Sequence, residues 1–196
     1  MLYLLRHAES APSPDIREPD WPLSDRGRRQ ARVIVPTLKC CGINAIYSSP
    51  YRRARETVAP FAEATGHDVT VHDGLRERLL TARFLDDVAT PARRTWADFS
   101  WSMPDGESNQ VAQRRFLATV STILGRHAGE TVLISTHGTV TALLLNAIDS
   151  GVGVAEWNAL EMPDLIRIHQ VDECGSSKVA GADGSLRWHR VNLPAS

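Results

Sequence analysis

The chain has 196 residues, of which 42% are hydrophobic and 23% are charged, and its formal net charge is −1. A chain of this size and composition can bury a full hydrophobic core, and we expect a single domain over residues 1–196. The balance of charge excludes the basic excess of a nucleic-acid-binding domain and the acidic tail of a disordered interaction region.

Short apolar runs and helical patterns alternate along the first part of the chain. Residues 2–5, "LYLL", predict a short buried strand, and the four prolines of residues 11–22 predict a loop. Ser24 suits the N-cap of the next helix, and Pro36 is expected to limit or kink that helix. Residues 43–49, "INAIYSS", predict a second strand.

The middle of the chain repeats this alternation and then becomes irregular. Pro50 suits the first turn of a helix that extends through residues 52–66. Residues 69–72 predict a third short strand, whereas residues 83–104 fit either a short helix or a loop. Residues 107–129 carry the clearest helical pattern of the sequence.

The last third of the chain predicts three more strands and one more helix. Residues 131–136 predict a buried strand, and residues 137–148 predict the helix that follows it. Residues 165–171 and 186–193 predict an antiparallel hairpin about a Gly/Ser-rich turn. The whole order predicts an α/β domain: a three-layer α/β/α sandwich with a mostly parallel central sheet and a C-terminal antiparallel edge hairpin.

No segment predicts a secretory signal or a membrane span. The apolar start of the chain is broken at Arg6, and residues 140–148 are far shorter than a helix that crosses a bilayer. The cysteines, Cys40, Cys41 and Cys174, form no C-x-x-C pair, which argues against a zinc site or a disulfide framework. We therefore expect a cytoplasmic protein with no membrane partner.

Basic side chains follow three of the predicted strands, at the point where each strand ends. Arg6 and His7 follow the first strand, an arginine-rich segment around Arg53 follows the second, and His137 follows the strand at 131–136. Because the carboxyl ends of parallel strands share one edge of a sheet, these side chains are expected to converge. Arginine forks and helix N-termini bind phosphate oxygens, so the pattern predicts an anion site.

Each of these features also has an ordinary structural explanation. A single histidine at a strand end more often packs or caps than catalyses, and an arginine-rich helix is usually a solvated face. A metal site is disfavoured because the guanidinium of Arg6, next to His7, would repel the ion. The convergence of three junctions at one edge is what favours a functional site.

At this point the sequence resembles the histidine phosphatase superfamily, whose members are also called phosphoglycerate mutase-like proteins. The resemblance rests on six segments in the family's order: "LLRHAES" (4–10), "PLSDRGRRQA" (22–31), "SSPYRRARET" (48–57), "LRER" (75–78), "DGESNQVAQR" (105–114) and "STHG" (135–138). The third segment selects Arg53 rather than Arg52 or Arg55, and the fourth selects Glu77. Two positions depart from the family pattern, because Ala8 stands where glycine is usual and Ser13 stands where asparagine is frequent.

The resemblance implies a role for each matched residue. His7 would be the nucleophile, which must be neutral to attack phosphorus, and Glu77 would protonate the leaving group and later take a proton from water. The phosphate-binding residues implied are Arg6, Arg53, His137, Gly138 and Ser13, with His137 also counted as catalytic. Neither a metal nor an organic cofactor is implied, since arginine and histidine supply the positive charge.

The activity implied is hydrolysis of a phosphomonoester of a small metabolite through a phosphohistidine intermediate. Two alternatives remain: a cofactor-dependent phosphoglycerate mutase, and a non-catalytic protein that binds a phosphorylated ligand. A lid insertion over about residues 78–105 would set substrate specificity, and its aromatic residues Trp96, Phe99 and Trp101 are expected to pack the lid onto the core. The substrate and the oligomeric state stay open, a homodimer included.

Overall fold

The computed structural model describes residues 1–171, 177–178 and 185–194, and every structural statement below concerns these residues. The strands are β1 (Leu2–Arg6), β2 (Ala45–Ser48), β3 (Val69–Val71), β4 (Val132–Thr136), β5 (Asp164–Val171), β6 (Ser177–Lys178) and β7 (Ser185–Val191). The α-helices are α1 (Asp25–Val33), α2 (Val35–Lys39), α3 (Arg52–Thr65), α4 (Ala89–Ala97), α5 (Asn109–Arg126), α6 (Gly138–Ile148) and α7 (Val154–Ala159). Two short 3₁₀ helices are η1 (Glu18–Asp20) and η2 (Asp73–Leu75).

One mixed sheet forms the centre of the molecule. Its order is β3-β2-β4-β1-β5-β6, and β7 also pairs with β5. The pairs β2–β3, β2–β4 and β1–β4 are parallel, whereas β5 runs antiparallel to β1 and to β7. The predicted parallel sheet with an antiparallel C-terminal hairpin is confirmed. Of the Gly/Ser-rich turn expected within that hairpin, residues 172–176 and 179–184 lie outside the described residues, and residues 177–178 form β6.

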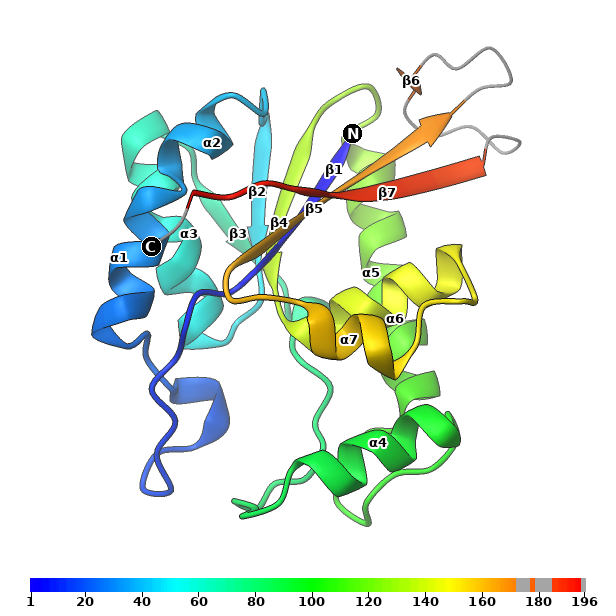
Figure 1. Ribbon diagram of the computed structural model, residues 1–196. Coiled ribbons are helices and arrows are strands. Elements are labelled where there is room, and N and C mark those ends of the chain that lie inside the picture. The colour runs from blue at the N-terminus through cyan, green and yellow to red at the C-terminus, as the bar shows by residue number, and fades with distance from the viewer. Residues whose placement is uncertain (172–176, 179–184, 195–196) are drawn as a thin grey trace.

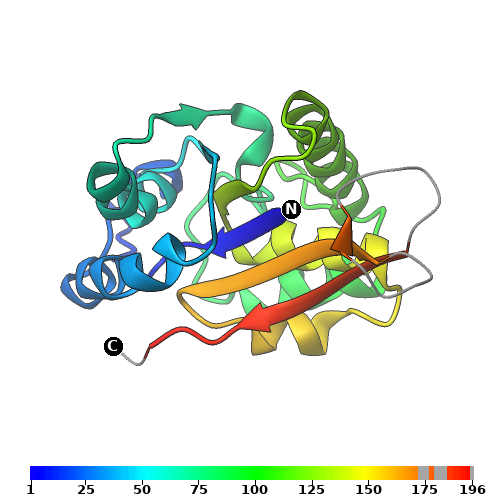
Figure 2. The ribbon, with the colours of Figure 1, turned by 90° about the horizontal axis from the view of Figure 1, so that it is seen from above.

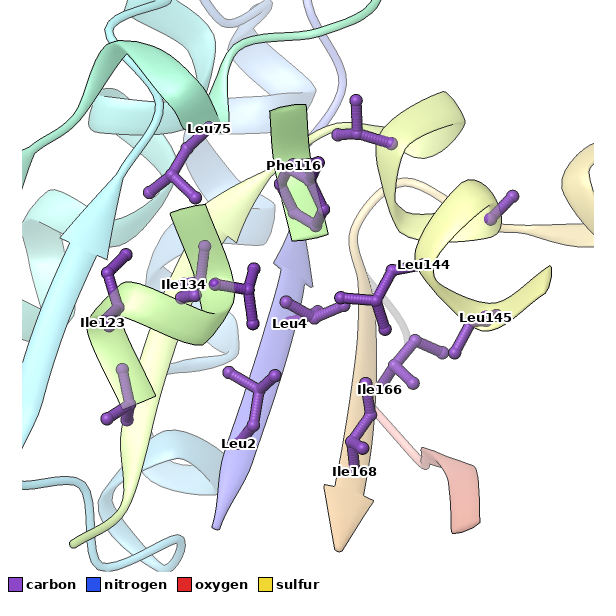
Figure 3. Packing of buried hydrophobic residues seen from close by; sticks show 14 of the residues in the cluster. Leu2, Leu4, Leu75, Phe116, Ile123, Ile134, Leu144, Leu145, Ile166 and Ile168 are labelled. Atoms are coloured by element: carbon purple, nitrogen blue, oxygen red, sulfur yellow. The ribbon is translucent and has the colours of Figure 1, made fainter. Parts of the chain in front are cut away.

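Helices cover both faces of the sheet, as the view from above shows (Figure 2). Because strand side chains alternate between faces, Leu2 and Leu4 of β1 pack under α5 and α6, while Tyr3 and Leu5 pack under α2 and α3. Figure 3 shows the first of these two clusters, in which Phe116 of α5 packs with side chains of the strands and of α6. The expected three layers are thereby confirmed.

Local sequence signals explain where several helices begin. The Ser24 hydroxyl accepts a hydrogen bond from the Gly27 N–H and caps α1, as predicted. Pro36 divides the predicted long helix into α1 and α2, because it lacks the N–H that a continuous helix needs. Pro50 is not part of the helix it was expected to open, since α3 begins two residues later with Tyr51 as its N-cap.

Two segments project beyond the carboxyl end of the parallel strands. Figure 1 shows residues 11–22 on one side, where η1 lies, and α4 with its flanking loops on the other side. The helix α4 settles the open choice for residues 83–104 in favour of a short helix between loops. None of the helices in the described part of the chain is long and apolar enough to cross a membrane.

Candidate active site

Strand register brings the two predicted catalytic histidines together. Arg6 of β1 lies opposite Thr136 of β4, so the next residue of each strand, His7 and His137, emerges at the same edge. The His7 N–H donates to the Thr136 carbonyl, which extends the pairing by one residue. The two imidazole rings are 5.2 Å apart between centroids and meet edge to face.

Two hydrogen bonds fix the tautomer of His7. Its Nδ1 lies 2.7 Å from the Ala8 carbonyl oxygen, which can only accept, so Nδ1 carries the proton. The Nε of Arg53 donates to His7 Nε2 over 3.1 Å, so Nε2 presents its lone pair. Burial, with a further contribution from the Arg53 guanidinium, lowers the pKa of His7 to about 3. The ring is therefore neutral at physiological pH, as nucleophilic attack requires.

His137 is fully buried and stands at the N-terminus of α6. Its Nε2 lies 2.7 Å from the Ser49 hydroxyl, and its Nδ1 has no hydrogen-bond partner among the described residues. Burial and the charge of Arg53 hold the pKa of this imidazole well below its usual value. A buried ring nitrogen without a partner is costly, and an oxygen of a bound ligand could relieve that cost.

Arg53 lies in the first turn of α3, close to both histidines. The residue is only 3% exposed, and its guanidinium stacks 4.9 Å from the Tyr51 ring centroid. Besides His7, it donates to the Glu18 carbonyl through Nη1 and to the Glu18 carboxylate through Nη2, each over 2.8 Å. Burial raises the pKa of the Glu18 carboxyl, and the Arg53 charge opposes that shift.

Arg6 reaches the same edge from β1 and packs against the start of α6. Its Nη1 donates to the Leu160 carbonyl over 2.6 Å, and its buried Nε has no partner among the described residues. A Cβ at Gly138 would lie 3.0 Å from the Arg6 guanidinium carbon, so glycine at this position leaves room for the guanidinium. Gly138, which was predicted to bind phosphate, thus borders the site through its contact with Arg6.

Glu77 accepts three backbone hydrogen bonds. The N–H groups of Thr139 and Val140, in the first turn of α6, donate to its two carboxylate oxygens over 3.0 and 3.2 Å, and the N–H of Arg78 donates over 2.8 Å. A carboxylate has about four lone-pair sites, so one remains for another donor. Glu77, Glu18 and Thr139 line a cavity of about 390 Å³, together with other residues of the loop before α1 and of the segment 80–85 before α4.

The structure does not bring Ser13 into hydrogen-bond contact with the other predicted site residues. Its hydroxyl accepts from the Asp15 N–H, and its carbonyl accepts from the Trp21 indole N–H. Ser49 and Thr57, which were given no role, support the site instead, since Thr57 Oγ1 accepts from the Ala8 N–H and Ser49 contacts His137. Both lie inside the segment "SSPYRRARET", so the matched motif already contained the two residues.

Of the three aromatic residues of the predicted lid, Trp96 packs on the core, Phe99 packs against Trp96, and Trp101 contacts Arg94. Trp96 of α4 meets the Phe99 ring edge to face at 5.5 Å and packs against the cluster beneath α5 and α6. The Arg94 guanidinium lies 4.4 Å from the Trp101 ring centroid. Within the described ranges, no three His, Cys, Asp or Glu side chains gather as ligands for a metal ion.

Comparison with known proteins yields one family and several relatives. Residues 2–192 match the histidine phosphatase superfamily (branch 1). The chain is 30% identical, over 168 residues, to the probable phosphoglycerate mutase GpmB of Citrobacter koseri, a match that covers 80% of this chain and 76% of that protein.

Solved structures share the fold. The chain is similar to a mycobacterial glucosyl-3-phosphoglycerate phosphatase with a TM-score of 0.71 and 27% identity, covering 100% of this chain and 98% of that one. That phosphatase has also been solved with inorganic phosphate and with VO3. Bacillus stearothermophilus YhfR is similar with a TM-score of 0.67 and 28% identity, covering 91% of this chain and 94% of that one.

Proposed function

The chain belongs to the histidine phosphatase superfamily (branch 1), and from this membership we propose that it hydrolyses phosphomonoesters of small metabolites through a phosphohistidine at His7. The reaction class is that of a phosphoric monoester hydrolase, which agrees with the similarity to the mycobacterial phosphatase over the whole chain. The observation that carries the proposal is the state of His7, whose Nε2 lone pair is held beside Arg53 and opposite His137.

The first step would transfer the phosphoryl group to the protein. The hydrogen bond from the Nε of Arg53 to His7 Nε2 would first open, which frees the Nε2 lone pair. His7 Nε2 then attacks phosphorus, the bond from phosphorus to the ester oxygen breaks, and the alcohol leaves. Arg6, Arg53 and His137 would stabilise the charge on the transferring oxygens, with no metal ion required. Glu77 would enter this step protonated and give its proton to the leaving alkoxide, through the one oxygen site that its three N–H donors leave open.

The second step would return His7 to its starting state. A water molecule attacks the phosphohistidine, Glu77 takes a proton from that water, and inorganic phosphate leaves. The cavity beside Glu77 would hold the alcohol in the first step and the water in the second. Residues 78–105, which line part of this cavity, would act as the lid that selects the alcohol.

Trapping the intermediate tests this proposal. Wild-type protein mixed with a labelled phosphomonoester and quenched in alkali should carry label on His7, and acid should release that label. The matched control is His7→Ala, which should carry no label while retaining the wild-type circular dichroism and melting temperature. No labelled protein at any time, with or without turnover, would contradict the phosphohistidine route, and ligand binding without turnover would favour the non-catalytic alternative.

The similarity to a probable phosphoglycerate mutase supports a second candidate activity. A mutase keeps its phosphohistidine for retransfer, so it needs a bisphosphoglycerate primer and interconverts 2- and 3-phosphoglycerate. The assay is therefore interconversion with and without primer, beside release of inorganic phosphate. Hydrolysis that is independent of primer supports the phosphatase, and primer-dependent interconversion without phosphate release supports the mutase.

Two further parts of the proposal concern conditions and substrate. We infer a metal-independent enzyme of the cytoplasm that acts on a small phosphorylated metabolite. Activity should persist in excess chelator, and loss of activity that added divalent metal restores would contradict the inferred mechanism. Comparison of kcat/KM across sugar phosphates, phosphoglycerates, nucleotides and phosphopeptides would identify the substrate class.

A further inference from the structure

We propose that Glu18 is a built-in competitor of the substrate, whose carboxylate holds Arg53 until a phosphoryl group displaces it. This inference rests on the proposed function, because it assigns Arg53 to the phosphoryl group. Of the five N–H groups of the Arg53 guanidinium, one on Nη1 donates to the Glu18 carbonyl, one on Nη2 donates to the Glu18 carboxylate, and Nε–H donates to His7. A phosphoryl group that takes the two N–H groups bonded to Glu18 must replace it.

The two ends of the loop that carries Glu18 are hydrogen-bonded to each other. An isolated bridge pairs Ser10 with Leu23, and the Ala11 N–H donates to the Pro22 carbonyl over 2.8 Å. Residues 12–21 thus leave and rejoin the body of the protein at one point. A compact surface loop of this length with adjacent ends can move as a unit about its base.

Within this loop, the hydrogen bonds are internal except at Glu18. The Trp21 indole N–H donates to the carbonyls of Ser13 and Ile16, and Arg17 pairs with Asp20. In the described part of the chain, the hydrogen bonds between residues 12–21 and the rest of the protein all come from Arg53. Displacement of Glu18 from Arg53 would remove these hydrogen bonds to the rest of the protein and leave the internal hydrogen bonds of the loop intact.

The solvent exposure of Arg53 and Glu18 is consistent with a contact that a ligand can displace. The Arg53 side chain is 4% exposed, whereas the Glu18 side chain is 30% exposed and lines the cavity beside Glu77. The arginine is fixed and the carboxylate reaches it from the solvent side. A phosphoryl dianion brings two negative charges to Arg53 in place of one, and it also reaches the donors of Arg6 and His137.

The competition has a quantitative consequence. A protein whose binding-competent state is only partly populated binds every ligand of that state more weakly by one common factor. Removing the Glu18 carboxylate should therefore tighten the binding of phosphate, of vanadate and of the substrate's phosphoryl group by the same factor. Loss of one hydrogen bond between charged groups corresponds to a gain in ligand affinity of about 10- to 100-fold.

The test is calorimetric titration of the whole protein with inorganic phosphate and with vanadate. Glu18→Ala should bind both more tightly by a common factor of about tenfold or more. The matched control is Asp20→Asn, which removes one negative charge from the same 3₁₀ helix without touching Arg53. It should change the affinity far less, which separates displacement from general charge repulsion.

Loop movement supplies a second readout. The Arg53 guanidinium lies 5.7 Å from the Trp21 ring centroid, so phosphate binding should change tryptophan fluorescence, and Trp21→Phe should abolish that change. Phosphate affinity that is unchanged or weaker in Glu18→Ala overturns the inference, as does an equal gain in Asp20→Asn. If neither the wild type nor any variant binds phosphate, the proposed function fails as well, which is a distinct result.

Discussion

Arg53 donates a hydrogen bond to His7, the proposed nucleophile, and we propose that it also binds the phosphoryl oxygens. Its replacement by alanine should lower kcat/KM about 10²- to 10³-fold, the usual cost of losing one strong donor to a developing oxyanion. Steady-state kinetics with a phosphomonoester would measure this loss. The control is Arg52→Ala on the same helix, because Arg52 is half exposed and pairs with Glu56 instead. Equal losses in the two variants would contradict the role given to Arg53.

Glu77 has two possible duties, as proton donor and as cap of α6, and one experiment separates them. Glu77→Gln cannot donate the proton, so hydrolysis of alkyl phosphates should fall about 10²- to 10⁴-fold. A phenyl ester with a nitro group needs no such proton, and its hydrolysis should fall much less. Similar losses with both ester types would indicate that Glu77 acts only by capping α6.

The convergence of site residues that follow strands could be predicted from the sequence, whereas the contact between Glu18 and Arg53 could not. His7, Arg53 and His137 each follow a strand. Because the carboxyl ends of parallel strands share one edge of a sheet, their convergence was expected. Glu18 lies in a proline-rich segment that has no periodicity, and its partner is 35 residues away. Which way such a loop folds back is decided by tertiary contacts that no local pattern contains.

At the scale of elements, the first turn of α1 packs closely against the backbone of the segment that follows β1. A Cβ at Gly27 would lie 2.0 Å from the Glu9 carbonyl oxygen, a contact that requires backbone movement. Gly27→Ala should therefore destabilise the protein by about 1–3 kcal/mol, the usual cost of overpacking. Urea denaturation would measure the change in the free energy of unfolding.

The matched control for Gly27 is Gly125, a glycine inside α5. A Cβ at Gly125 would meet no atom within 4 Å, and the residue is exposed. Gly125→Ala should stabilise the protein by about 0.5–1 kcal/mol, because alanine loses less backbone entropy in a helix than glycine does. Effects of the same sign at both positions would contradict the role given to the contact with Glu9.

The elements themselves were largely predictable because their signals are local. Apolar runs marked the strands, and Ser24 and Pro36 marked helix boundaries where the structure has them. For residues 83–104 the sequence did not distinguish a short helix from a loop. The reason is that α4 has few buried side chains, among them Ala92 and Thr95, so its hydrophobic periodicity is weak.

At the scale of the whole molecule, the two buried histidines couple stability to pH. The pKa values of His7 and His137 are lowered on folding, so below the ordinary value near 6.5 the unfolded chain binds protons that the folded chain does not. Stability should therefore fall as the pH drops below 6.5, by about 1.4 kcal/mol per pH unit for each imidazole. Urea denaturation between pH 7.5 and 5.0 would measure the slope.

A single substitution isolates one of these contributions. In His7→Asn, the slope below pH 6.5 should be shallower by about 1.4 kcal/mol per pH unit, since the variant lacks that imidazole in both states. Other titrating groups contribute equally to both proteins and cancel in the difference. Identical slopes in the two proteins would show that His7 takes up its proton in the folded state as well.

The central position of β1 affects how the protein is made. β1 pairs with β4 on one side and with β5 on the other, so Leu4 needs both Ile134 and Ile166 as neighbours. A nascent chain therefore exposes this apolar strand until more than 160 further residues have left the ribosome. Fragments that end before β4 should aggregate or be degraded. None of them should have activity, because they lack His137, which the proposed site places beside His7.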